Sequence, residues 1–247
     1  MRYFMELSYN GTPFCGWQVQ PGCDTVQGVL ENAMGCLLRE TVALTGCGRT
    51  DTGVHARIYF AHFESDKDID TKYFVNKLNS FLPKEIAVKR IFAVPDDLHA
   101  RFSATSRTYK YYVAVEKEAF RFHYAYRVFV PLDIEKMNQA ASLLLDTVDF
   151  TSFSKLHTQV NNNNCKVTEA HWAMEDGLLV FTITADRFLR NMVRAIVGTL
   201  LQVGKGKVSL EDFHRIIESK DRCAAGDSAP AHALFLDTVQ YGNFLNE

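Results

Sequence analysis

The chain has 247 residues, of which 47% are hydrophobic and 23% charged, and its formal net charge is −2. This length suits one large domain or two of about 120 residues, and the slightly acidic balance argues against a simple nucleic-acid coat. No apolar run is long enough to span a bilayer, and the N-terminus reads as a strand, not as a signal peptide. The six cysteines and eight histidines show neither a C-x-x-C pair nor zinc-ligand spacing. We therefore expect a cytoplasmic protein with reduced thiols and no metal.

The first part of the chain predicts the order strand, helix, strand, strand, helix, strand. The run Asp24 to Gln27 is typical of a capping box at the start of the first helix, and this order is that of the split βαβ unit of ferredoxin-like domains. The expected ranges are a strand at 2–10, a loop at 11–23, a helix at 26–38, strands at 42–45 and 58–63, a helix at 71–81 and a strand at 86–94.

The rest of the chain repeats this plan loosely. The turn Glu175-Asp176-Gly177 is typical of a hairpin between two strands. We expect an α+β fold of two ferredoxin-like halves, residues 1–102 and 103–247, whose mainly antiparallel sheets meet at a central cleft. The expected ranges in the second half are a strand at 103–115, a helix at 134–145, strands at 165–174 and 178–185, helices at 187–203 and 210–219, and a strand at 233–241.

A glycine-rich turn between two expected strands carries the strongest chemical signal. The run Gly46 to Ala56 contains three glycines, with Arg49 and Asp51 two positions apart. Glycines permit tight turns and close approach of a ligand, and such a turn presents a side chain from a rigid frame. No serine or cysteine with a nearby base competes for the role, which makes the Asp51 carboxylate the candidate nucleophile. The alternative is a structural aspartate that caps a turn.

Two basic segments are candidates for contacts with RNA. Arg187, Arg190 and Arg194 recur at spacings of three and four, which predicts one face of the helix at 187–203; a solvated face is the alternative. In the strand segment 107–112, Tyr109 alternates with cations in a pattern that suits base stacking, although core packing also favours tyrosine in strands. The candidate phosphate contacts, which predict salt-sensitive binding, are Arg101, Arg107, Arg187, Arg190, Lys205 and Lys207.

Eight blocks in order along almost the whole chain resemble the tRNA pseudouridine synthase A family. Three positions depart from the family pattern: Asn10, where aspartate is usual, Thr52, where a small residue is common, and Ala233, where glycine is usual. The blocks are 9–12 with Phe14, Gly16-Trp17-Gln18 and Gln20; 48–51 with 53–56; Leu78-Asn79 with Leu82-Pro83; 99–102; 107–109; Asp149-Phe150 with Ser152-Phe153; Phe188-Leu189 with 192–194; and 229–231.

This resemblance implies an isomerase that converts uridine to pseudouridine in the anticodon stem-loop of tRNA, at family positions 38–40. It implies that Asp51 is the catalytic aspartate, that Arg194 pairs with it, and that Arg49 helps to hold the flipped nucleotide. Tyr109 is then the aromatic partner of the target base and Leu234 packs in its pocket. The resemblance further implies a homodimer with a joint basic groove and no cofactor or metal. Attack of the carboxylate on the ribose C1′ and on the uracil C6 both remain open.

Two other functions fit parts of the sequence. A non-catalytic RNA-binding module is one, because ferredoxin-like sheets with exposed aromatic residues bind single strands. A hydrolase that uses Asp51 with His55 is the other, although neither a metal cluster nor a second acid accompanies this pair. Retained function after Asp51→Asn would favour the binding module.

Overall fold

The computed structural model describes residues 1–155 and 162–245, which form a mixed α/β protein whose strands pair mostly antiparallel. The chain divides into two compact units, which we describe separately. The first unit comprises Met1–Thr105 with Phe235–Glu247, and the second comprises Ser106–Leu234. The expected division fell at 102/103 and assigned residues 235–247 to the second half, so the two divisions differ mainly in the placement of this last segment.

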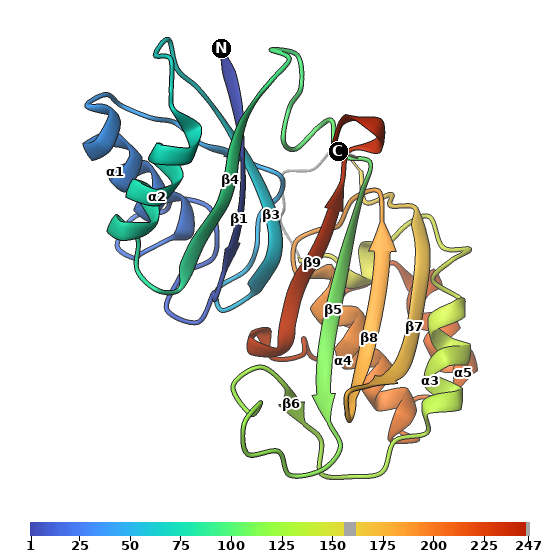
Figure 1. The fold of residues 1–247 in the computed structure, drawn as a ribbon. Coiled ribbons are helices and arrows are strands. Elements are labelled where there is room, and N and C mark those ends of the chain that lie inside the picture. The colour runs from blue at the N-terminus through green and yellow to red at the C-terminus, as the bar shows by residue number, and fades with distance from the viewer. Residues whose placement is uncertain (156–161, 246–247) are drawn as a thin grey trace. The chain divides into compact units, whose positions relative to one another are not determined.

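The first unit is a sheet whose central strand is buried on both faces. Strand β1 pairs antiparallel with β3 and with β4, and the short β2 pairs antiparallel with β3. The two helices pack against each other, and α2 packs against β4 (Figure 1). The elements are β1 (Arg2–Tyr9), α1 (Val26–Leu38), β2 (Thr45–Gly46), β3 (His55–Glu64), α2 (Thr71–Phe81) and β4 (Ile86–Val94), with a 3₁₀ helix at Gly242–Leu245.

Strand β9 (Leu234–Gln240) explains why the last segment of the chain belongs to the first unit. It pairs parallel with β3, with Phe235 opposite His55 and Leu236 opposite Ala56. Just beyond it, the buried Tyr241 donates its hydroxyl to the Ala100 carbonyl at 2.6 Å. These contacts join residues far apart in sequence, which a local pattern does not reveal.

Over its described residues, the second unit is built on a mainly antiparallel sheet with helices packed together beside it. Strand β8 lies between β5 and β7, and the short β6 pairs parallel with β5. Helix α3 packs against β7 and α4, and α5 packs against both helices (Figure 1). The elements are β5 (Ser106–Ala114), β6 (Tyr126–Arg127), α3 (Ile134–Ser142), β7 (Val167–Glu175), β8 (Leu178–Ala185), α4 (Met192–Gly204) and α5 (Leu210–Ser219), with 3₁₀ helices at Thr151–Phe153 and Ala231–Ala233.

Two local predictions near α1 are wrong, for a common reason. Thr25 caps the helix by accepting from the Gly28 amide, but the Gln27 side chain does not complete a capping box. It donates instead to the Leu44 carbonyl, while Glu31 accepts from the Leu44 amide. Side chains of α1 therefore satisfy the Leu44 backbone, and strand β2 begins only at Thr45, not at Val42.

The helix expected at 187–203 begins five residues later, at Met192. Asn191 adopts a left-handed conformation with φ of 66°, which is incompatible with a continuous α-helix through this point. Upstream, Asp186 Oδ1 accepts from the Arg187 amide at 2.7 Å and stabilises a turn. Arg187 and Arg190 therefore lie outside α4, and the prediction that they share a helical face with Arg194 is wrong.

Candidate active site

The Asp51 residue lies in a tight turn of the first unit, between β2 and β3. The Val54 amide donates to the Asp51 carbonyl at 3.1 Å, and Gly53 has a φ of +79°, which favours glycine. The Gly53 amide in turn donates to the Phe14 carbonyl at 3.3 Å. Asp51 itself is partly exposed. The backbone on both sides of the carboxylate is thus fixed.

The loop at 11–17 holds this turn by close backbone contact. A Cβ atom on Gly11 would lie 2.0 Å from the Val54 carbonyl oxygen, and one on Gly16 would lie 2.2 Å from the Thr50 carbonyl oxygen. The Trp17 amide also donates to Thr50, at 3.4 Å. Only glycine allows an approach this close, so the loop and the turn fit together as one backbone assembly.

Three buried aromatic side chains support the same turn. Trp17 and Tyr59 stack with ring centroids 4.1 Å apart, and Tyr9 meets the edge of Tyr59 at 5.5 Å. The Tyr9 hydroxyl lies 2.9 Å from Thr50 Oγ1, and the Tyr59 hydroxyl donates to the Gly48 carbonyl. Large aromatic side chains bury much apolar area while their hydroxyl groups fix polar neighbours. This cluster therefore gives the turn a rigid base.

His55 supports the loop, which argues against its pairing with Asp51 as a hydrolase. Its side chain is 1% exposed and stacks on Phe235 at 4.5 Å. Its Nδ1 atom accepts from the Gly11 amide at 3.0 Å. A general base needs a free lone pair within reach of the proton it removes, and this nitrogen already serves as a backbone acceptor.

Two of the predicted basic residues meet in one pocket of the first unit. Arg49 and Arg101 are both exposed and line a cavity of about 160 Å³ together with Trp17 and Gln18. Because Arg49 is two residues from Asp51, this pocket adjoins the Asp51 turn.

In the second unit, Tyr109 lies on β5 opposite Ile183 and is partly exposed. Its ring meets the Phe188 ring edge-on, with centroids 5.1 Å apart. The Arg107 guanidinium donates to the Asp186 carbonyl at 2.7 Å. Strand β5 and the segment 186–191 are therefore joined next to Tyr109.

Arg194 lies in the first turn of α4 and is held by the backbone of Ala229. Its Nε atom donates to the Ala229 carbonyl at 2.7 Å, and the Ala229 amide donates to the Arg194 carbonyl at 2.9 Å. One helical turn later, a Cβ atom on Gly198 would lie 1.8 Å from the Asp227 carbonyl oxygen. The segment at 226–230 thus lies directly on α4 and orients the guanidinium.

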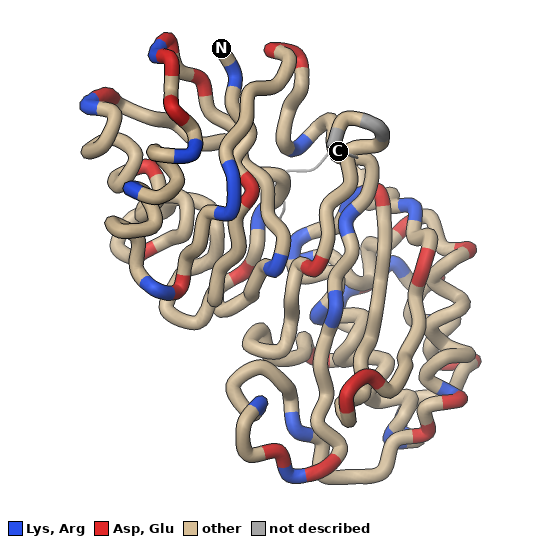
Figure 2. The backbone as a smooth tube through the Cα atoms, viewed as in Figure 1, with Lys and Arg blue, Asp and Glu red and all other residues tan. Residues whose placement is uncertain are grey.

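The remaining predicted residues are spread along the second unit. Arg190 is exposed, and its carbonyl accepts from the Lys155 amide at 3.1 Å. Leu234 is 4% exposed at the start of β9. Lys205 ends α4, and Lys207 lies just beyond it. Figure 2 shows cations interleaved with acidic residues over both units, so the small net charge is a sum of many opposite charges.

Two classes of feature have no candidate in the part of the chain that the structure describes. No group of three or more histidine, cysteine, aspartate or glutamate side chains is placed to hold a metal ion there. Over the same residues, every helix is too short or too polar to cross a membrane.

Comparison with known proteins decides the family. The profile of the tRNA pseudouridine synthase family matches residues 7–103 and 140–242. The tRNA pseudouridine synthase A of Parabacteroides distasonis is 54% identical over 241 residues, which cover 97% of this chain and 96% of that protein. The protein of the same name from Bacillus subtilis is 42% identical over 247 residues, which cover 98% of this chain and 100% of the relative. This chain belongs to the tRNA pseudouridine synthase family.

The resemblance inferred from the sequence blocks is confirmed at the level of the family and its isomerase class. The two matched ranges include the Asp51 turn, both arginines of the adjoining pocket, and α4 with Arg194. Arg107 and Tyr109 lie between the two ranges. Membership in this pseudouridine synthase family therefore rests on segments from both units.

Sequence reasoning missed the residues that position the predicted site residues. Gly11 and Gly16 were named only as parts of a loop and of the resemblance, and Trp17 only as part of the resemblance, yet all three hold the Asp51 turn. Phe188 beside Tyr109 was missed in the same way. The available signal was the density of glycine and proline in the loop at 11–23. This density predicts close backbone packing, but it does not show that the loop packs against the Asp51 turn. Asn10, where the family usually has aspartate, accepts from the Thr12 amide at 3.1 Å, as an aspartate oxygen also could.

Proposed function

We propose that this protein isomerises uridine to pseudouridine in tRNA, with Asp51 as the nucleophile. The observation that carries the proposal is the rigidly held Asp51 turn at 46–56. It presents one carboxylate from a backbone held by glycine contacts and buried aromatic rings, in a chain of the pseudouridine synthase family. A reacting group that is already held in the right orientation lowers the activation barrier, because less entropy is lost in the transition state. The fixed backbone of this turn orients the Asp51 carboxylate in that way.

The reaction conserves all heavy atoms of the nucleotide. The N1–C1′ glycosidic bond breaks, the uracil turns, and a C5–C1′ bond forms. The C5 hydrogen leaves to solvent as a proton, and N1 takes up a proton from solvent, so the product is an isomer of the substrate. No electron is gained or lost overall, so the chemistry needs no oxidant or reductant. Asp51 acts by adding to C1′ or to C6 of the target nucleotide, and its release restores the carboxylate. Either route requires the carboxylate in its ionised form, because only that form is nucleophilic.

The other predicted site residues have roles in this reaction. Arg194, oriented by Ala229, supplies positive charge to the catalytic aspartate. Tyr109 stacks on the extruded uracil and recovers part of the few kcal/mol that base flipping costs. Arg49 helps to hold the flipped nucleotide and Leu234 packs in the base pocket. Phosphate contacts come from Arg101, Arg107, Arg187, Arg190, Lys205 and Lys207.

We also propose the finer architecture that the family resemblance implies. Each unit is a ferredoxin-like half, and the two sheets meet at a central cleft that receives the RNA. Strands β4, β1, β3 and β2 of the first unit pair antiparallel in that order, which supports this for that unit, and the parallel strand β9 also pairs with β3. The protein acts in the cytoplasm as a homodimer on the anticodon stem-loop, at family positions 38–40.

The test uses unmodified tRNA transcripts that carry tritium at uracil C5. Purified protein should release tritium to water, because C5 loses its hydrogen when it becomes the glycosidic carbon. Carbodiimide labelling with primer extension then maps the new pseudouridines, which should lie at positions 38–40. Release of tritium from other uridines would correct the substrate site alone, and no release from any transcript would refute the activity.

A further inference from the structure

The pocket beside the Asp51 turn has the composition of an anion site. Two arginines, Arg49 and Arg101, line it together with Trp17, Gln18 and the backbone around Gly48. Among the described residues that line this pocket, none carries a carboxylate. Two guanidinium groups that line one concavity give it a positive potential, which favours a negatively charged ligand. The cluster is therefore built for a negatively charged group.

Arg101 is held at the pocket by two histidines that act as backbone acceptors. His99 Nδ1 accepts from the amides of Arg101 and Phe102 at 3.0 and 3.2 Å, and His62 Nδ1 accepts from the Ala100 amide at 3.1 Å. Burial lowers the pKa of both imidazoles, that of His62 to about 4. Both rings are thus neutral near pH 7, as an acceptor nitrogen requires.

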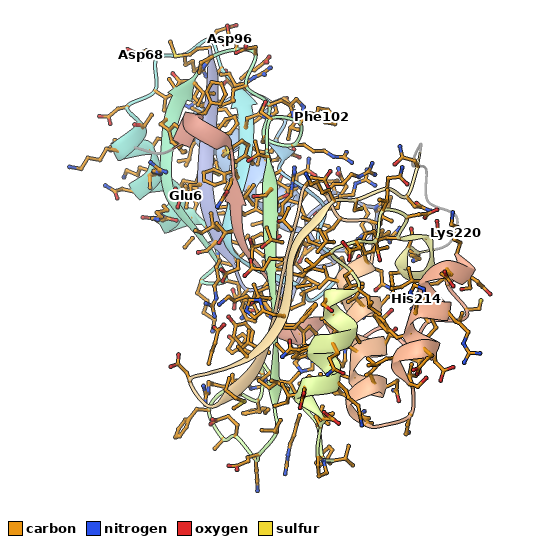
Figure 3. All side chains as sticks on the ribbon, turned by 90° about the vertical axis from the view of Figure 1, so that its right-hand side faces the viewer. Glu6, Asp68, Asp96, Phe102, His214 and Lys220 are labelled. Carbon is orange, nitrogen blue, oxygen red and sulfur yellow. The ribbon has the colours of Figure 1, made fainter. Side chains whose placement is uncertain are left out.

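The surroundings of the pocket favour a nucleic acid over a free small anion. Phe102 is 77% exposed and stands out from the first unit (Figure 3), with the Arg101 guanidinium 5.5 Å from its ring centroid. Exposed aromatic rings next to cations stack on bases while the cations bind phosphates. Pockets that enclose a whole small molecule typically measure about 300–1,000 Å³, and this one measures about 160 Å³. Its size suits one group of a larger ligand.

We propose that this pocket binds a single phosphodiester group of the RNA, clamped between Arg49 and Arg101. The identity of the ligand rests on the proposed function. Arginine binds phosphate oxygens through paired N–H donors, and two such groups fix both the position and the direction of the backbone. Arg49 precedes Asp51 by two residues in the same turn. A phosphate held by Arg49 and Arg101 therefore sets the register of the RNA relative to the nucleophile.

Two variants remove the clamp by different physical routes. Arg101→Gln deletes one guanidinium. Gly48→Asp introduces a carboxylate at a residue whose φ is not positive and whose added Cβ would meet nothing within 4 Å, so the new anion occupies the pocket without a clash. Lys72→Gln is the matched control, because Lys72 is an exposed cation on α2 of the same unit. Each change is made in an Asp51→Asn background, so that binding is measured without turnover.

The first measurement is the salt dependence of tRNA binding. Arg101→Gln and Gly48→Asp should each weaken binding by about tenfold and reduce the slope of log K against log salt by about 1. Lys72→Gln should change neither quantity. Equal slopes for the Arg101 and Lys72 variants, with thermal unfolding midpoints unchanged, would overturn the proposal.

The second measurement identifies the phosphate. A panel of stem-loop RNAs each carries one neutral methylphosphonate linkage on a 2′-deoxynucleotide. At one position in the RNA, the neutral linkage should lower the affinity for the protein with the intact pocket by about tenfold. The same linkage should cause no further loss of affinity in Arg101→Gln or Gly48→Asp. The same loss at every linkage in all proteins would overturn the clamp. Competition by inorganic phosphate without any linkage dependence would show a free-anion site and overturn the assignment to RNA. A preserved linkage effect without tritium release by the wild-type protein would refute only the proposed reaction.

Discussion

The turn around Asp51 and the start of α4 around Arg194 position their proposed functional residues through different contacts. At the turn, the main chain makes close contacts on both sides of Asp51: Gly16 lies against Thr50, and Phe14 accepts from Gly53. At α4, the functional side chain is itself bonded, because Arg194 Nε donates to the Ala229 carbonyl.

The difference follows from the chemistry of each group. A nucleophilic carboxylate must keep its reacting oxygen available to the substrate, so its position is best set through the main chain. A guanidinium has five donors, and one of them can fix its direction while others bind elsewhere. At the turn, substitution of a residue that contacts the backbone, such as Gly16, should therefore lower turnover. At α4, substitution of Arg194 itself should lower turnover.

Apart from replacement of Asp51 itself, the largest effect is expected at Arg194. Arg194→Met keeps much of the side chain's apolar bulk but removes the charge and the bond to Ala229, so turnover should fall by at least about 10²–10³-fold with tRNA affinity nearly unchanged. Tritium release and equilibrium binding measure the two quantities. Arg215→Met, at an exposed position of α5, is the control. Near-normal turnover by Arg194→Met would reject the role.

The next test separates backbone contact from backbone conformation. Gly16 and Gly22 have nearly equal φ values, +82° and +81°, but an added Cβ meets the Thr50 carbonyl at 2.2 Å in the first case and nothing within 4 Å in the second. Gly22→Ala should lower the free energy of unfolding by about 1–2 kcal/mol, the cost of an alanine in the left-handed conformation. Gly16→Ala should cost more in the free energy of unfolding, and should lower turnover even though Asp51 is intact. Equal effects of both changes on denaturant unfolding and on turnover would show that the contact is unimportant.

At Tyr109, the expected loss is that of one stacked base. Tyr109→Ala should weaken tRNA binding by about 1–3 kcal/mol, while Tyr109→Phe keeps the ring and should bind normally, with any loss confined to turnover. Tyr73→Ala, at an exposed position of α2, controls for the removal of an aromatic ring. Unchanged affinity and rate for Tyr109→Ala would exclude stacking.

The smallest effect concerns the histidine that supports Arg101. Burial, His99 and Arg2 lower the pKa of His62 to about 4 in the folded protein, whereas the unfolded chain takes up a proton near pH 6.5. The unfolded state therefore binds more protons between these values, so stability is lost as the pH falls from about 6.5 toward 4. His62→Gln should reduce this loss by about 2 kcal/mol or less, measured by urea unfolding at pH 7 and 5. The exposed-site variant His171→Gln is the control. If His62→Gln lost as much unfolding free energy between pH 7 and 5 as the wild type and His171→Gln do, His62 would not be the group responsible.

How far the sequence alone reaches depends on whether a feature is local. The Asp176-Gly177 turn has φ values of 47° and 78°, the left-handed pair that these residue types predict, and α2 spans the expected residues 71–81. The Asp51 turn was also predictable, because its glycines and flanking strands lie within one short segment. The start of α4 was not, since periodicity continues through Asn191 and carries no sign of its left-handed backbone.

The features that escaped prediction depend on partners distant in sequence. Gln27 and Glu31 satisfy the Leu44 backbone from α1, which displaces a strand that the apolar pattern favours. The pairing of β9 with β3 joins residues about 180 positions apart. Support of Asp51 by Gly11 and Gly16 is likewise visible only after the loop has folded against the turn.

The central claim is that Asp51 performs chemistry and is not needed for the fold. Its most direct test compares Asp51→Asn with Asp68→Asn, a matched change in the exposed loop between β3 and α2 (Figure 3), by single-turnover tritium release at saturating protein. Asp51→Asn should bind tRNA and unfold at the wild-type temperature but release no tritium, while Asp68→Asn should react at the wild-type rate. Tritium release by Asp51→Asn at a rate close to that of Asp68→Asn would contradict the account.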